Sequence, residues 1–245
     1  MQQNWIILGA SSSMARAFAR KAATEGCNLL LAGRDLTDLR QSAKDCVLRG
    51  APSAKAVKFD ARLPAGFAPI LETAGNWDGA INVAVFVSSM PEQADVDADP
   101  SILDLTIQDG FTGPTRFLHM IAPMMEDRGC GTIVGIGSVA GDRGRVGNYV
   151  YGATKAGFAT YLSGLRNRLA RKGVHVLTVK PGFVDTTMTW GLDGLFLVAA
   201  PADVADAIWR AIAKQRNEIY LPFFWRYIML IIRHIPEMIF KKLSI

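Results

Sequence analysis

The chain has 245 residues, half of them hydrophobic, and a formal net charge of +5. This length and apolar content suit a single α/β domain with a sizeable core. The modest charge, without a basic run interleaved with aromatic residues, excludes an obvious nucleic-acid-binding class.

Short apolar runs predict strands near residues 4–8, 28–32, 56–59, 80–85, 132–136, 174–179 and 218–221. Helical patterns fill the gaps, including a long helix from about Tyr149 to Lys172. This alternation predicts one doubly wound, seven-stranded parallel sheet with helices on both faces. We assign residues 1–221 to this domain and residues 222–245 to an apolar, helical C-terminal tail.

The first predicted strand ends in a turn of small residues and is followed at once by a helical pattern. Such a turn lets the backbone approach a pyrophosphate, while the helix N-terminus presents free N–H groups to it. Of the three glycines usual at such a turn, only Gly9 is present; Ser13 and Ala15 take the other two places. The candidate cofactor-binding residues here are Gly9, Ser11, Ser12, Ser13 and Met14.

The second predicted strand ends at Gly33, and Arg34 and Asp35 follow it. A carboxylate at the strand end would bond the ribose 2′-hydroxyl of NAD, whereas a guanidinium suits the 2′-phosphate of NADP. Arg34 therefore favours NADP over NAD. Asp35 either weakens this preference or is an ordinary N-cap of the next helix.

Tyr151 and Lys155 lie four residues apart on the long predicted helix, with Ser138 thirteen residues before the tyrosine. This spacing places both side chains on one helix face. The ammonium would then lower the pKa of the phenol, which transfers a proton to or from a carbonyl oxygen that Ser138 orients. These three residues are the candidate catalytic set.

Together these motifs resemble the short-chain dehydrogenase/reductase family over almost the whole chain, which implies a Rossmann fold. The resemblance also implies that Asp60, with Ala61, contacts adenine and that Lys155 bonds the nicotinamide ribose. It implies that the loop containing Pro181, Gly182, Val184 and Thr186 closes over the nicotinamide end. The segment Asn82, Val83 and Ala84 is matched to the family's cofactor-contacting run after the fourth strand.

Two departures from the family pattern bear on activity. Val85 stands where the family has a glycine, and Gly110 stands where it usually has an asparagine supporting a proton relay to the lysine. A missing amide is replaced by water or leaves the relay impaired. These departures favour an alternative, a non-catalytic nucleotide-binding scaffold, which the intact Ser138, Tyr151 and Lys155 oppose.

The segments at 137–145, 148–151 and 221–226 are similar to the reductases paired with decaprenylphosphoryl-ribose oxidation, which reduce a 2-keto sugar on a polyprenyl phosphate. The resemblance implies an NADP-dependent oxidoreductase that reduces a ketone or keto-sugar, with a small-molecule or lipid-linked carbonyl substrate. Reduction of a soluble acyl or steroid-like ketone is the alternative within the enzyme class. Arg143 and Arg145 border the expected substrate mouth, where they either hold a phosphate or serve as solvated loop residues. The apolar segment 192–198 predicts a cover for a hydrophobic substrate.

The tail combines a broad apolar face with five Lys/Arg and two Asp/Glu over residues 216–245, an excess of three positive charges. It either lies in a membrane interface or packs on its own domain or a partner subunit, as in a homo-oligomer. Pro236 predicts two shorter helices rather than one. The three scattered cysteines have no metal or redox spacing, and the histidines form no ligand cluster. We therefore expect no metal and a cytoplasmic location, peripheral to the inner membrane face in the first alternative.

Overall fold

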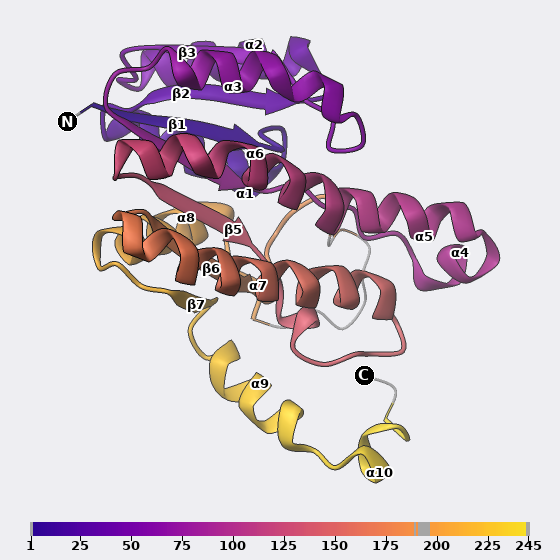
Figure 1. Cartoon of the computed structure of the whole chain (residues 1–245). Coiled ribbons are helices and arrows are strands. Elements are labelled where there is room, and N and C mark those ends of the chain that lie inside the picture. The colour runs from indigo at the N-terminus through magenta and orange to yellow at the C-terminus, as the bar shows by residue number, and fades with distance from the viewer. Residues whose placement is uncertain (1, 189, 191–196, 244–245) are drawn as a thin grey trace.

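The computed structural model describes residues 2–188, 190 and 197–243. Within them, one parallel sheet has the strand order β3-β2-β1-β4-β5-β6-β7 (Figure 1). Its strands are β1 (Gln3–Leu8), β2 (Asn28–Gly33), β3 (Ala54–Lys58), β4 (Ala80–Val85), β5 (Thr132–Ile136), β6 (His175–Pro181) and β7 (Glu218–Leu221). The order reverses between β1 and β4, and the cofactor of a doubly wound sheet binds at such a switch point. The predicted fold class is confirmed.

Helices cover both faces of the sheet. The α-helices among the described residues are α1 (Ser13–Thr24), α2 (Leu36–Leu48), α3 (Ala68–Gly75), α4 (Gln93–Ala98), α5 (Pro100–Ile107), α6 (Gly113–Arg128), α7 (Tyr149–Leu169), α8 (Pro201–Ala213), α9 (Trp225–His234) and α10 (Glu237–Phe240). A π-helical turn, η2 (Gln108–Thr112), joins α5 to α6, and a short 3-10 helix, η3 (Val139–Gly141), follows β5. The long helix predicted to reach Lys172 ends as α-helix at Leu169, and its last three residues form a 3-10 turn.

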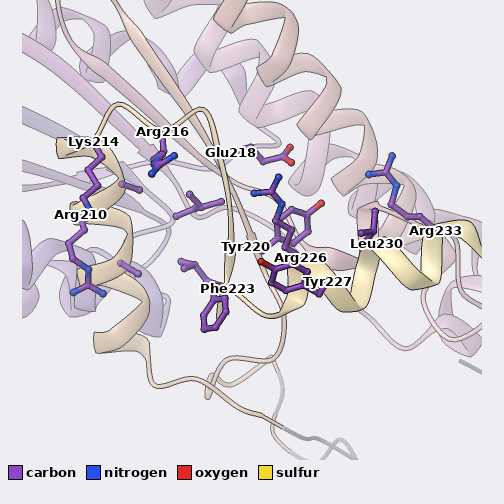
Figure 2. A pocket seen from close by; sticks show the side chains of 14 residues that line it. Arg210, Lys214, Arg216, Glu218, Tyr220, Phe223, Arg226, Tyr227, Leu230 and Arg233 are labelled. Atoms are coloured by element: carbon purple, nitrogen blue, oxygen red, sulfur yellow. The ribbon is translucent and has the colours of Figure 1, made fainter.

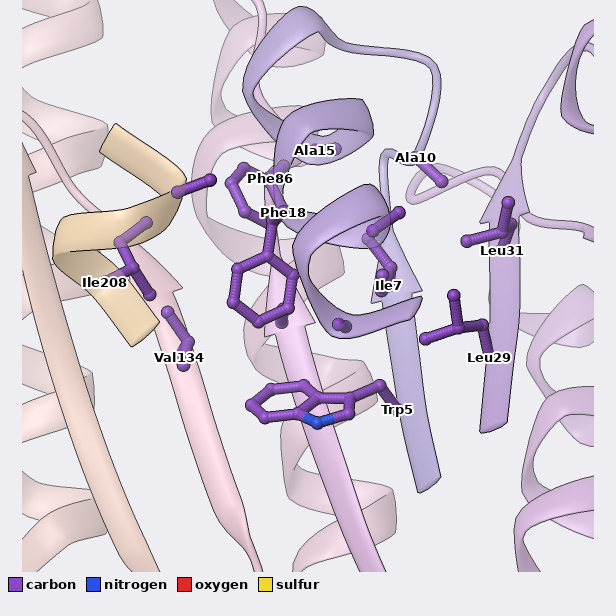
Figure 3. Close-up of a cluster of buried hydrophobic side chains, with 14 of the residues drawn as sticks. Trp5, Ile7, Ala10, Ala15, Phe18, Leu29, Leu31, Phe86, Val134 and Ile208 are labelled. Carbon is purple, nitrogen blue, oxygen red and sulfur yellow. The ribbon is translucent and has the colours of Figure 1, made fainter. Parts of the chain in front are cut away.

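Strand alternation divides the core into two layers. Trp5 and Ile7 of β1 face α1, α2 and α8, where the Trp5 ring meets Phe18 edge-on at 4.9 Å (Figure 3). Ile6 and Leu8 face the other way, toward α3, α6 and α7. Because side chains on successive strand residues point to opposite faces, each apolar run serves both layers. The sheet is thus fixed rigidly between two helical layers, which holds the carboxyl ends of its strands in place.

The tail forms two helices, α9 and α10, as predicted from Pro236. They leave the sheet at the end of β7 (Figure 1). Trp225 and Met229 of α9 are buried against Val139 and the loop after β6. A Cβ at Gly182 would lie 2.0 Å from Trp225 Nε1, so the indole occupies space that only glycine leaves open. One face of the tail therefore packs on its own domain.

The opposite face of the tail is exposed. Its apolar residues include Phe223, Tyr227, Leu230, Ile231, Met238 and Ile239, each more than half accessible to solvent. None of the described helices is long and apolar enough to cross a membrane. The tail is therefore amphipathic, with one side in the core of the domain and one side uncovered.

Candidate functional site

The three candidate catalytic residues meet at the carboxyl end of β5. Ser138 follows that strand, and Tyr151 and Lys155 come from the first two turns of α7. Tyr151 forms a side-chain hydrogen bond with Ser138, and Lys155 Nζ donates to the backbone carbonyl of Ile136 at 2.9 Å. The ammonium lies 5.7 Å from the centre of the Tyr151 ring. The predicted spacing on one helix face is confirmed, and both side chains are buried.

Burial dominates the electrostatics of this group. It raises the pKa of Tyr151, and the hydrogen bond with Ser138 lowers that pKa only in part. Burial also lowers the pKa of Lys155 from its ordinary 10.5 to about 8. The expectation that Lys155 brings down the pKa of Tyr151 is therefore corrected, because the phenolate is poorly solvated and the ammonium bonds a carbonyl instead. The phenol is held in its protonated, donating form.

A cavity of about 140 Å³ opens over these residues. The predicted residues Met14, Pro181, Gly182, Val184 and Thr186 line one part of it, together with Tyr151 and Lys155. Other lining residues come from the segment after β4 and from the loop between Ser138 and Tyr151. The apolar segment expected at 192–198 lies mostly outside the described residues; its last two members, Leu197 and Val198, are exposed.

A second cavity, of about 120 Å³, adjoins the first through Phe86 and Ser88, which line both. Its walls include the predicted residues Gly9, Ser11, Ser12, Arg34, Asp60 and Ala61. Gly9 has φ +73°, and a Cβ there would lie 3.0 Å from the Phe86 carbonyl carbon. Glycine is therefore required at this place. Ser13 is the first residue of α1, and Ser12 is its N-cap.

The outer end of this second cavity is cationic. Arg34 is exposed on its wall, and Lys58 Nζ donates to the Arg34 carbonyl at 2.5 Å, which places a second cation beside the first. Asp35 is the N-cap of α2, accepting from the amides of Thr37 and Asp38 at 2.9 and 3.1 Å. Its carboxylate is thus turned to the helix, in agreement with the second of the two sequence interpretations.

The interpretation of Asn82, Val83 and Ala84 as cofactor contacts is corrected. All three lie inside β4 and are buried, and Asn82 Nδ2 donates to Gln3 Oε1 near the amino end of the sheet. Val85 is the last residue of the same strand. The residues that reach the cavities come after the strand: Phe86, Val87 and Ser88. The end of β4 would have predicted these residues correctly, whereas sequence similarity to the family motif pointed to residues inside the strand.

Gly110 lies in the π-helical turn and packs directly against α7. A Cβ there would lie 2.6 Å from Thr154 Oγ1 and 2.9 Å from Thr154 Cβ. The threonine hydroxyl donates to the Tyr151 carbonyl at 2.8 Å. Thr154 therefore fills space beside the glycine, and an asparagine side chain does not fit without rearrangement of α7.

An ion pair that sequence reasoning missed supports the nucleotide end of the site. Arg62 binds Asp109 in a two-pronged contact, Nε to Oδ1 at 2.9 Å and Nη2 to Oδ2 at 2.7 Å. Asp109 is buried and lines the second cavity. The pair joins the loop after β3 to the turn before α6, next to Asp60, whose carboxylate accepts from the Arg62 amide.

The family model of short chain dehydrogenases matches residues 3–193. The chain belongs to this family. An uncharacterised oxidoreductase of Mycobacterium tuberculosis is 30% identical over 97% of this chain and 96% of its own length. A ketoacyl reductase of Nostoc is 28% identical over 87% of this chain and 76% of its own length.

Among solved structures, a short-chain dehydrogenase of Sphingobium yanoikuyae in complex with NADPH superimposes with a TM-score of 0.84. It is 25% identical and the match covers 96% of this chain and 97% of that one. Membership in the family makes the protein an NAD(P)-dependent oxidoreductase. The residues present fit a nicotinamide dinucleotide, since the cradle at Gly9 that a Cβ would fill leads to the buried Tyr151 and Lys155.

Proposed function

We propose that the protein is an NADPH-dependent reductase of a ketone or keto-sugar. The observation that carries the proposal is Ser138 hydrogen-bonded to Tyr151 beside Lys155, in a cavity that adjoins the second cavity, which Gly9 and Arg34 line. No other described group combines a buried proton donor, a neighbouring hydroxyl and an ammonium in this way. The glycine at 110, which favoured a scaffold role from sequence, is accounted for by packing against Thr154.

When bound, NADPH supplies a hydride to a carbonyl carbon. Gly9, Ser11 and Ser12 would hold its pyrophosphate at the start of α1, and the loop Pro181–Thr186 would hold the nicotinamide end. Tyr151 would donate its proton to the carbonyl oxygen, and Ser138 would orient that oxygen. Lys155 would bond the ribose and offset the negative charge that develops on the phenol oxygen.

The preference for NADPH over NADH would come from Arg34 and Lys58. Arg34 is an exposed cation on the wall of the second cavity and Lys58 is an exposed cation beside it, whereas the adjacent Asp35 carboxylate caps α2. A 2′-phosphate gains a charge-assisted contact with each of them, and a 2′-hydroxyl does not. Asp60 would contact the adenine.

The test is NADPH oxidation by the purified protein with a panel of acyl ketones, bulky ketones and keto-sugars, followed by absorbance. Tyr151→Phe is expected to lower kcat by on the order of 10³-fold or more while NADPH binding, followed by fluorescence, stays within about twofold. Tyr161→Phe, on the same helix nearly three turns further on, is the control. Equal turnover by Tyr151→Phe and the parent protein would contradict the mechanism.

We further propose that the tail holds the protein at an anionic membrane surface, where a polyprenyl-phosphate-linked keto-sugar is a fitting substrate. The exposed apolar residues of α9 and α10 support this, because such a face needs a cover. A groove of about 1040 Å³ lies beside α9, between α8 and β7 (Figure 2). Its cations, suited to phosphate headgroups, are Arg210, Lys214, Arg216, Arg226 and Arg233.

Vesicle sedimentation tests the membrane proposal. The parent chain is expected to sediment with phosphatidylglycerol vesicles and not with phosphatidylcholine vesicles, and the double variant Leu230→Glu, Ile231→Glu is expected to lose binding. Leu48→Glu, at an exposed leucine on α2, is the matched control. Unchanged sedimentation of the double variant would contradict the proposal. An altered oligomeric state without lipid binding would assign the face to a homo-oligomer instead.

A further inference from the structure

The loop between Ser138 and Tyr151 carries two arginines with opposite environments. Arg143 is fully engaged by the tail: it donates to Glu237 Oε2 at 2.6 Å and to the Arg233 carbonyl at 3.1 Å. Its guanidinium also lies 4.2 Å from the centre of the Phe240 ring. These contacts are those of a structural arginine, which ties a loop to a distant segment.

Arg145 has no such partners. Its Nη2 reaches only Met229 Sδ, at 3.3 Å, and its Nε is buried without any hydrogen-bond partner. Among the described residues, no carboxylate lies within ion-pair distance of it. A thioether is a weak acceptor, and burial lowers the pKa of this guanidinium more than the Asp142 carboxylate raises it, so the charge is only partly compensated. A half-buried arginine whose Nε has no partner would be stabilised by an arriving anion.

The position of Arg145 indicates where such an anion would bind. Arg145 lines the same cavity as Ser138 and Tyr151, the residues that would handle the substrate carbonyl. Met229, which supports it from the tail, is fully buried and restrains the side chain. Arg145 thus belongs to the part of this cavity that the loop between Ser138 and Tyr151 contributes.

Asn148 provides a second, independent observation in the same cavity. It precedes the first residue of α7, where a side-chain oxygen usually accepts from the helix amides. Asn148 makes no such bond, and the amide of Val150 instead donates to Gln93 Oε1 at 3.2 Å. Asn148 Oδ1 is left buried with no partner, although it lines the cavity. An unpaired buried acceptor calls for a donor such as a hydroxyl.

We propose that Arg145 binds an anionic group of the substrate, a carboxylate or a phosphate, and that Asn148 accepts a hydrogen bond from a neighbouring substrate hydroxyl. This inference rests on the proposed reductase function and narrows its substrate class to acidic, hydroxylated ketones. Arg145 acts as a specificity-determining residue, because it contacts the substrate away from the carbonyl that Tyr151 and Ser138 bind.

Two matched substrate pairs test the inference: 4-oxopentanoate against its methyl ester, and dihydroxyacetone phosphate against dihydroxyacetone. The parent protein is expected to prefer the acid over the neutral compound in one of the pairs. Preference for 4-oxopentanoate would indicate a carboxylate site, and preference for dihydroxyacetone phosphate would indicate a phosphate site. Arg145→Met is expected to lower kcat/KM for that acid on the order of 10- to 100-fold, the range of a charge-assisted hydrogen bond. The neutral partner and NADPH binding should stay within about threefold. Arg145→Lys should restore part of the preference, and Arg171→Met, an exposed change on another face, should have no effect.

Calorimetric titration of the same four compounds into the NADPH complex distinguishes a failure of the anion site from a failure of the reductase function. Binding of an acid that is lost in Arg145→Met, without turnover by the parent protein, would support the anion site and contradict the reductase function. Equal rates on acidic and neutral ketones in both proteins would overturn the anion site and leave the reductase function intact. An equal loss on both members of a pair would show that Arg145 is merely structural, which also overturns the inference.

Discussion

Introducing a single methyl group at Gly110 tests how closely the turn before α6 packs on the helix that carries the reactive residues. In Gly110→Ala the new Cβ would lie 2.6 Å from Thr154 Oγ1, about 0.8 Å inside the 3.4 Å at which ordinary contact begins. Thr154 is buried and its hydroxyl is bonded to the Tyr151 carbonyl, so it cannot turn away freely. Overpacking of this kind costs about 1–3 kcal/mol of unfolding free energy.

Urea unfolding followed by circular dichroism measures this cost. Gly164→Ala is the matched control, because that glycine lies within α7 and an added Cβ meets nothing within 4 Å. There the better helix propensity of alanine should stabilise the protein by roughly 0.5–1 kcal/mol, the opposite sign.

The double variant Gly110→Ala, Thr154→Ala completes a thermodynamic cycle. Removing the threonine relieves the collision, so the two changes together should cost less than the sum of the single changes by about 1 kcal/mol or more. Strictly additive costs, or a Gly110→Ala protein as stable as the parent, would refute the packing explanation. The absence of the family's asparagine would then need a functional explanation.

Three further predictions follow from contacts in the site. Arg62→Met should lower the unfolding free energy by about 3–5 kcal/mol in urea unfolding, because it leaves Asp109 charged and buried. A smaller loss in the double variant Arg62→Met, Asp109→Leu would confirm the cause. Lys58→Ala should raise the Kd for NADPH roughly 5- to 20-fold in a fluorescence titration and leave the Kd for NADH unchanged, and an equal change for both would disprove a 2′-phosphate contact. Burial lowers the folded-state pKa of Lys155 from 10.5 to about 8, so the buried ammonium reduces the free energy of unfolding below that pKa. As the pH increases from about 8 to 10, the free energy of unfolding should therefore rise relative to that of Lys155→Met. Parallel stability curves for the two proteins would show that the lysine is not desolvated.

The sheet was accessible from sequence because its strands are continuous apolar runs bounded by small residues. The Tyr151–Lys155 pair was equally accessible, since helical spacing fixes which side chains share a face. The fourth strand shows the limit of this reasoning. Asn82 matches the family's cofactor-contacting motif in sequence, but its position within the sheet depends on the register of β4 with β1. Strand register depends on residues far apart in the sequence. The three-dimensional structure was therefore needed to show that Phe86 and Ser88 line the two cavities.

Electrostatics were the other part that sequence did not reveal. The sign of the pKa change at Tyr151 depends on the balance between burial and its neighbours, and spacing on a helix specifies only the neighbours. The ion pair of Arg62 and Asp109 joins residues 47 positions apart, and no local pattern connects them. The different environments of Arg143 and Arg145, two positions apart in one loop, likewise arise from contacts with the tail.

The contacts between that loop and the tail have a consequence for the order in which the protein assembles during synthesis. Arg143 and Arg145 depend on partners that lie 84 to 94 residues later in the chain and are therefore synthesised after them. The half of the sheet that cradles the dinucleotide is made first and can begin to fold during translation. The contacts of Arg143 and Arg145 with the tail can form only after α9 and α10 have been synthesised, so the nucleotide cradle of a nascent chain can form before this loop is fixed.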